Sequence, residues 1–148
     1  VECEQIRGSL QVPEVASGSL RDRLTAVGEA MVAFTSRPKM VQFERRIAAE
    51  TEHDPAVGAA FLEAGPHRMK QSFAALLAAM HEAGEVEIAD PALAAEQFAG
   101  MCKGMGDLER RFGAPADPQR NRERIAGAVE VFCRAYAREP TCETEADR

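Results

Sequence analysis

Hydrophobic residues recur along this chain at intervals of three and four, which is the spacing of helices that bury one face. The first stripe follows Ser19, which can cap a helix running to about Thr35. A second, shorter stripe follows Pro38 and ends near Glu52. Both stripes are apolar on one side only, so each predicts a helix packed against a core. Their members are Leu20, Leu24, Val27, Met31 and Phe34, then Met40, Phe43 and Ile47.

The dipeptide Asp-Pro occurs three times, at residues 54–55, 90–91 and 117–118. The Asp side chain can accept a hydrogen bond from a free amide of the first helical turn, and Pro suits the first helical position. Each dipeptide therefore predicts the start of a helix. Gly65-Pro66 predicts a kink or break, Gly84 and Gly113 predict helix ends, and the last helix should run to about Arg138.

These signals predict an all-α fold, a helical bundle of about six helices. Residues 2–10 resemble the end of a connecting helix, and residues 139–148 form a polar tail that we expect to be disordered. Residues 85–88 alternate like a strand, but no second run is available to pair with them. We therefore interpret residues 85–88 as an extended linker into the Asp90-Pro91 cap.

The two last predicted helices, over residues 91–111 and 118–138, carry apolar stripes that cover about half of each circumference. Stripes this wide can contact the rest of the domain and a partner at once. The alternative is that both helices fill the core of a monomer, and periodicity alone leaves the two equal. Glu96, Lys103, Asp107 and Arg110 lie opposite the first stripe and predict a solvated face. The helical Gly100, Gly104 and Gly106 are more typical of close helix packing than of a dinucleotide site.

Charge argues against nucleic-acid binding by these residues. The net charge is −6, and it arises in residues 51–100, where eight acidic side chains face only Arg68 and Lys70. Without a basic stripe the phosphate-driven part of DNA affinity has no source. The chain has no Trp and one Tyr, no apolar run long enough for a bilayer and no signal peptide, so we expect a cytoplasmic protein without membrane contact. It begins at Val1 as if in mid-helix, which indicates part of a longer protein.

The sequence holds no catalytic constellation, and we expect neither an enzyme nor a cofactor. Glu63 with His67, and His81 with Glu85, share helix faces, but spacing implies no third ligand, so no metal site is predicted. Four separated cysteines form no Cys-x-x-Cys pair and are interpreted as free thiols. A redox sensor built on Cys102 and Cys133 is the alternative for the cysteines.

The Asp-Pro caps, the Glu63-Ala64-Gly65-Pro66 kink, the helix Ala94-Ala95-Glu96-Gln97-Phe98 and the final amphipathic helix together resemble a known family. They are similar to the C-terminal effector-binding and dimerisation domain of TetR-family transcriptional repressors, nearest to the AefR-like branch. The resemblance covers residues 1–138. The helix-turn-helix that such proteins place upstream is not found here, so the resemblance implies that DNA is contacted only through an N-terminal domain missing from this chain.

The resemblance implies a homodimer, in which the last two helices of each subunit form a four-helix bundle. The apolar stripes then assign the dimer interface to five side chains, Phe98, Cys102, Val129, Phe132 and Tyr136. The resemblance also implies a small apolar effector that binds between the helices of each subunit. This effector would favour one spacing of the two DNA-binding domains of the dimer.

Met and Phe residues suit an apolar pocket, although residue by residue core packing is the commoner role. We expect the effector to contact six side chains, Met31, Phe34, Phe43, Phe73, Met101 and Met105. Gln97, which borders the apolar face, and His67 or Gln71 are candidates for orienting it. Two alternatives stay open: a helical small-molecule carrier with no link to DNA, and a dimerisation module with a filled core.

Overall fold

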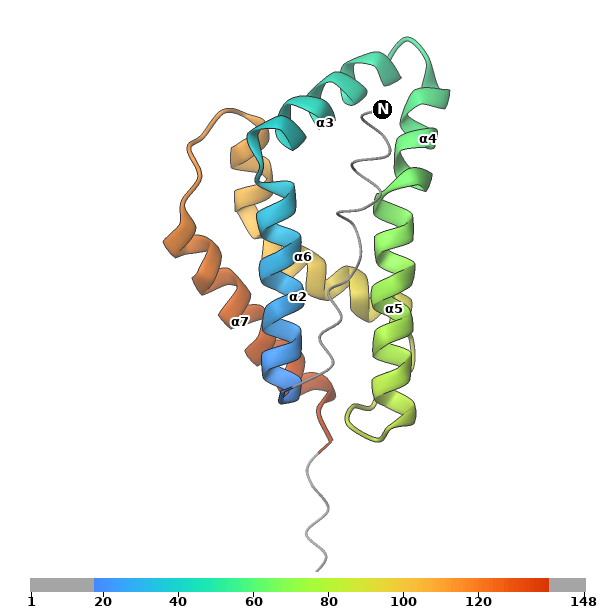
Figure 1. Cartoon of the computed structure of the whole chain (residues 1–148), viewed down its shortest axis with the longest axis vertical. Helices are drawn as coiled ribbons and strands as arrows, with labels where there is room; N and C mark the ends of the chain where they lie inside the picture. The colour runs from blue at the N-terminus through green and yellow to red at the C-terminus, as the bar shows by residue number, and fades with distance from the viewer. Residues whose placement is uncertain (1–17, 139–148) are drawn as a thin grey trace, which may run out of the picture.

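The computed structural model describes residues 18–138, and these fold into helices joined by short turns (Figure 1). The predicted all-α class is confirmed. The predicted connecting helix over residues 2–10 and the tail over residues 139–148 lie outside the described residues. The helices are α2 (Leu20–Thr35), α3 (Pro38–Thr51), α4 (Pro55–Ala64), α5 (Pro66–Glu82), α6 (Pro91–Arg111) and α7 (Pro118–Tyr136).

The predicted caps form as expected. Ser19 and Asp22 form a capping box at the start of α2. The carboxylates of Asp54, Asp90 and Asp117 each accept a hydrogen bond of 3.0 Å from a first-turn amide, at the starts of α4, α6 and α7. These bonds satisfy amides that the helix itself leaves free, so local sequence determines where the helices begin. Gly65 separates α4 from α5, which confirms the predicted break.

The core lies between α2, α5, α6 and α7. Phe98 of α6 stands at its centre, with its ring centroid 5.4 Å from that of Phe73 and 5.4 Å from that of Phe132. Leu24 of α2 and Leu77 of α5 are fully buried beside these rings. Aromatic side chains at this depth cost about 3–5 kcal/mol when they are truncated to Ala. These four helices therefore form the stable body of the domain.

Residues 85–88 form the expected extended linker, and both of its apolar side chains are buried. Val86 makes an isolated antiparallel bridge with Ala137, just after α7. The amide of Glu87 donates to the carbonyl of Tyr136 at 2.8 Å, and the amide of Arg138 donates to that of Glu85 at 3.1 Å. These bonds attach the end of α7 to the turn between α5 and α6. The helix α7 ends at Tyr136, two residues before the predicted end at about Arg138.

The helix α6 is broken near its middle, which the sequence analysis did not predict. Gly104 has φ 48° and ψ −148°, outside the helical region, and the rest of the helix is rotated beyond it. Asp107 and Arg110, expected on a solvated face, are only 21% and 12% exposed because the rotation turns them toward α3. The expected solvated stripe is therefore wrong beyond Gly104.

The helices α3 and α4 pack on each other and form what we call the α3–α4 arm, residues 38–64. The arm crosses the top of the molecule in Figure 1 and continues into α5 through Gly65. Phe43 and Phe61 meet edge to face with centroids 5.8 Å apart. Only Val41 is buried in α3, and α4 buries no side chain. Within residues 18–138, none of the helices is both long and apolar enough to cross a membrane.

Candidate functional site

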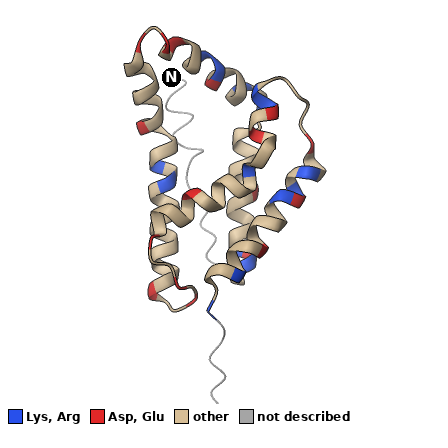
Figure 2. Ribbon diagram, turned by 180° about the vertical axis from the view of Figure 1, so that it is seen from behind, with Lys and Arg blue, Asp and Glu red and all other residues tan. Residues whose placement is uncertain are grey.

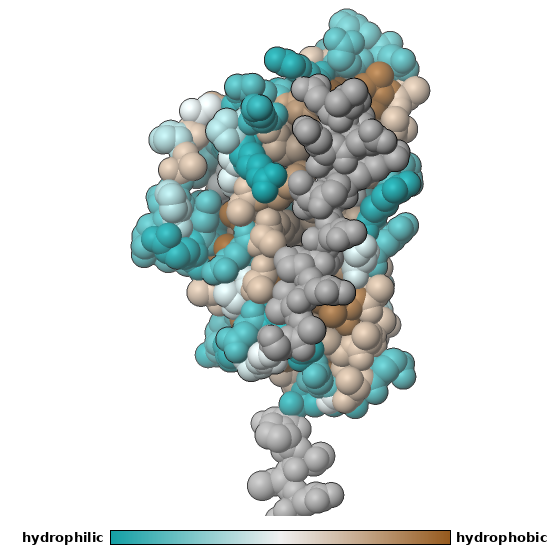
Figure 3. Space-filling model, viewed as in Figure 1, coloured by the Kyte–Doolittle hydropathy of each residue, from teal (hydrophilic) through white to brown (hydrophobic). Residues whose placement is uncertain are grey.

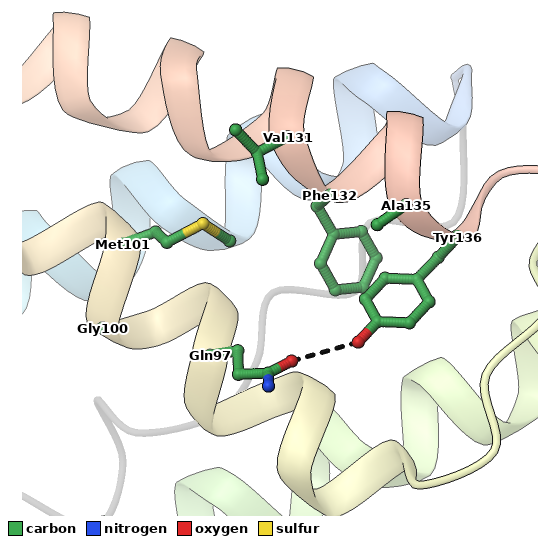
Figure 4. Close-up of a pocket in the computed structure, with 7 residues that line it drawn as sticks. All are labelled: Gln97, Gly100, Met101, Val131, Phe132, Ala135 and Tyr136. Atoms are coloured by element: carbon green, nitrogen blue, oxygen red, sulfur yellow. Dashed lines mark hydrogen bonds between the residues drawn. The ribbon is translucent and has the colours of Figure 1, made fainter.

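An apolar groove of about 510 Å³ lies between α6 and α7, on the outside of the body. In Figure 4 its walls come from one side of each helix, with Met101 facing Val131 and Phe132. The two helices lie side by side here because their inner faces share the aromatic core around Phe98. The lining residues are Gln97, Gly100, Met101, Val131, Phe132, Ala135 and Tyr136.

One hydrogen bond crosses the groove. The hydroxyl of Tyr136 donates to the side-chain oxygen of Gln97 at 3.0 Å (Figure 4). Both groups are neutral, and the other lining side chains are apolar. The groove therefore suits an apolar surface with one polar contact, and it contains none of the paired acids, bases or nucleophiles that catalysis requires.

Two helical glycines lie on the outer side of α6 and α7, and nothing within residues 18–138 of a single chain explains why these positions have no side chain. A β-carbon added at Gly100 of α6 or at Gly127 of α7 would meet no atom within 4 Å. Glycine inside a helix costs about 1 kcal/mol relative to Ala. Val131, four residues after Gly127, is 54% exposed although it is apolar. Small residues and an exposed Val are typical of a face that another helix approaches closely.

Four of the five predicted interface side chains face inward instead. Phe98, Cys102, Val129 and Phe132 are between 0% and 3% exposed within a single chain, so almost none of their surface is left for a partner to cover. We correct this assignment: the inner half of each wide apolar stripe packs on the chain's own core. Phe132 still closes one side of the groove, and Tyr136 lines it at half-burial.

The six side chains predicted to contact an effector do not converge. Met31 and Phe73 belong to the buried core, and Phe34 is buried near the end of α2. Phe43 lies on the arm, whereas Met101 lines the outer groove.

Met105 is 59% exposed, and it does not line the same groove as Met101. A helical wheel puts Met101 and Met105 on one face, but Gly104 breaks the helix between them. Val131 lines the groove although it was not predicted to, because a helical wheel cannot say which edge of a wide stripe faces outward. The sequence features that pointed to this groove were Gly100 and Gln97, which both line it.

The cysteines within residues 18–138 are buried free thiols. Burial raises the pKa of Cys102 to about 12 and also raises the pKa of Cys133, so both stay protonated. A redox role for Cys102 and Cys133 gains no support from this environment. Within residues 18–138 there is also no cluster of three or more His, Cys, Asp or Glu side chains that could bind a metal ion.

Known proteins share this sequence pattern and this fold. A family model described as the C-terminal domain of AefR-like transcriptional repressors matches residues 22–138. The flavonoid-responsive regulator FrrA superposes with a TM-score of 0.81 at 26% identity, over 94% of this chain and 71% of that chain. No curated protein has a significantly similar sequence.

Two further solved structures share the fold. A TetR-family regulator from Mesorhizobium loti has a TM-score of 0.80 at 22% identity, over 92% of this chain and 68% of that chain. A TetR-family regulator from Pseudomonas syringae pv. tomato has a TM-score of 0.74 at 19% identity, over 93% of this chain and 72% of that chain. Identities this low show the fold alone.

Proposed function

Because the chain belongs to the TetR family of transcriptional regulators, in the AefR-like branch whose C-terminal domain matches it, we propose that it senses a small apolar effector and holds a regulator as a homodimer. The observation that carries the dimer is the outer groove with Gly100 in its lining, together with Gly127 on α7, because both glycines leave room that a single chain does not use. A second copy of α6 and α7 would fill this room and complete a four-helix bundle.

The effector site is proposed beneath the α3–α4 arm, between the arm, α2 and α5. The support is a contrast in packing. The body is closely packed, whereas the arm is rich in apolar residues and buries only Val41. In Figure 3 hydrophobic surface shows at the upper right, where α3 meets α4. Phe34, Phe43 and Phe61 lie on the three helices α2, α3 and α4 that would enclose the ligand.

Regulation would then be a shift between two arrangements of the dimer. An effector changes the balance only if it binds one arrangement more tightly than the other. DNA contact is assigned to a helix-turn-helix domain outside residues 18–138. Basic and acidic side chains alternate along α7 and the end of α6 (Figure 2), which is unlike the single basic face that binds phosphates.

The test is thermal unfolding of the whole chain with a panel of apolar aromatic compounds, flavonoids included because the relative FrrA is flavonoid-responsive. A compound at ~100 times its Kd should add about 2.7 kcal/mol to the free energy of unfolding. Phe43→Glu should abolish the gain by placing a charge beneath the arm. Leu62→Glu, on the exposed side of the same arm, is the matched control and should keep it.

Two outcomes would favour other functions. If no compound raises the unfolding temperature while the protein is dimeric, the chain is a dimerisation module with a filled core. If a compound binds a monomer and Phe43→Glu has no effect, the proposed site beneath the arm is wrong, and the groove between α6 and α7 becomes the binding site to examine.

A further inference from the structure

A single arginine joins the α3–α4 arm to the far end of α6. The guanidinium of Arg45 donates through Nε to the carbonyl of Arg111 at 2.7 Å and through Nη2 to the carbonyl of Arg110 at 2.9 Å. Both carbonyls belong to the last turn of α6. The carbonyl of Arg111 has no following helical turn to bond it, and the carbonyl of Arg110 also accepts from the amide of Gly113 at 3.3 Å. A cation at this end also complements the helix dipole, and charge-assisted hydrogen bonds are about twice as strong as neutral ones.

The carboxylate beside Arg45 does not share this role. Glu44 lies 4.0 Å from the Nε of Arg111, and its Oε2 is buried without a hydrogen-bond partner among residues 18–138. On α6, the carboxylate of Asp107 forms ion pairs with Nη2 of Arg110 at 2.7 Å and with Nη2 of Arg111 at 2.9 Å. Both of these arginines of α6 are therefore already paired with a carboxylate of their own helix. The directed polar contacts between the arm and α6 come from Arg45.

Little else holds the arm to the body. The helix α3 buries only Val41, and α4 stacks on α5 beyond Gly65, which has φ −131° and ψ −80°. The two helices of the arm hold each other more firmly. Phe43 of α3 contacts Phe61 of α4. Thr51 also packs closely against Gly58, because a β-carbon added to Gly58 would lie 2.7 Å from the Thr51 side chain. The arm is thus a unit, joined to the body at Ser36–Arg37 and at Gly65.

We propose that Arg45 is a latch that closes the α3–α4 arm onto the end of α6, and that its release lets the arm open as a unit while the body stays folded. The opening would act as the entrance to the effector site, and that part rests on the proposed function. The latch itself does not, because it can be measured without any effector. Its partner atoms lie on the segment of α6 beyond Gly104, which also contacts α7 through Arg124 and Glu109 at 3.6 Å.

The experiment is hydrogen exchange of the whole chain, read by mass spectrometry for each helix. Arg45→Ala should raise the exchange rates of α3 and α4 amides about tenfold, while those of α5 and α7 stay as in the wild type. Arg45→Lys, which keeps the charge but loses the paired donors, should give a smaller rise. Arg46→Ala is the matched control. Arg46 is exposed and, among residues 18–138, makes no hydrogen bond or ion pair.

Two results would overturn the latch. Unchanged exchange in α3 and α4 of Arg45→Ala would show that the arm is held by other contacts. An equal rise in every helix would show that Arg45 supports global stability and does not control a separate arm. Failure of the effector screen with a positive exchange result would leave the latch standing and reject only the entrance role.

Discussion

Arg124 of α7 lies across Gly104 of α6, with its Cδ 3.2 Å from the position that a β-carbon on Gly104 would occupy. The guanidinium extends past Gly106 toward Asn121 and Glu109, at 3.3 Å and 3.6 Å. Because both glycines lack side chains, the long arginine can lie flat over the break in α6. This contact joins the rotated end of α6 to the helix that we propose at the dimer interface.

Gly104→Ala should lower the free energy of unfolding by about 1–3 kcal/mol, because φ 48° with ψ −148° is accessible essentially to glycine alone. Urea unfolding followed by circular dichroism measures the change. The double variant with Arg124→Ala separates backbone strain from contact. If the penalty of Gly104→Ala persists without Arg124, the cause is the backbone. If it disappears, the contact with Arg124 caused it and our explanation of the break is wrong.

Val131→Asp should give a folded monomer, since Val131 is exposed on the outer face and would place a charge between two subunits. Phe132→Asp, one residue further, should instead unfold the protein because it buries an unpaired charge and removes a core ring. Sedimentation velocity together with circular dichroism distinguishes the two. A wild type that sediments as a monomer at high concentration would refute the dimer, and a dimeric Val131→Asp would move the interface elsewhere.

Glu44 should make stability fall as pH rises above about 4.5, the ordinary pKa of a glutamate. Burial raises its pKa above the ordinary 4.5, further raised by Asp107 and partly opposed by Arg111, Arg110 and Lys103. The folded state therefore holds a proton that the unfolded state has already released, and stability is lost as the folded carboxyl ionises. Glu44→Gln lacks this loss, so its stability relative to the wild type should increase as pH rises above about 4.5 in urea titrations. A relative decrease would mean that pairing with Arg111 outweighs burial.

Cys102 should resist alkylation in the folded protein. With a pKa of about 12 the thiolate fraction at pH 8 is about one in ten thousand, and the side chain is fully buried. Iodoacetamide labelling followed by peptide mass spectrometry should modify Cys102 only when urea unfolds the chain. Rapid labelling in buffer would indicate local opening of α6 near Gly104 and would revive the redox interpretation.

Local features of the sequence were enough to place the helices. The carboxylate of Asp90 bonds a first-turn amide, and Pro91 removes one donor, whatever the rest of the chain does. The glycine at residue 84 could likewise be predicted as a helix end, because glycine tolerates a positive φ that strains other residues, and Gly84 does adopt φ 78°. Such effects involve neighbours in sequence, so they can be derived without knowing the fold.

The tertiary structure alone decided which side of each helix is inside. Phe132 and Val131 are adjacent and both apolar, yet one is at the core and the other at the surface. A stripe covering half a helix does not specify its inner edge, and the break at Gly104 then invalidates any wheel drawn across it. The bond from Arg45 to the carbonyl of Arg111, 66 residues away, depends on where α3 crosses α6. No local pattern encodes such a crossing, because it is set by how the side chains of four packed helices fit together.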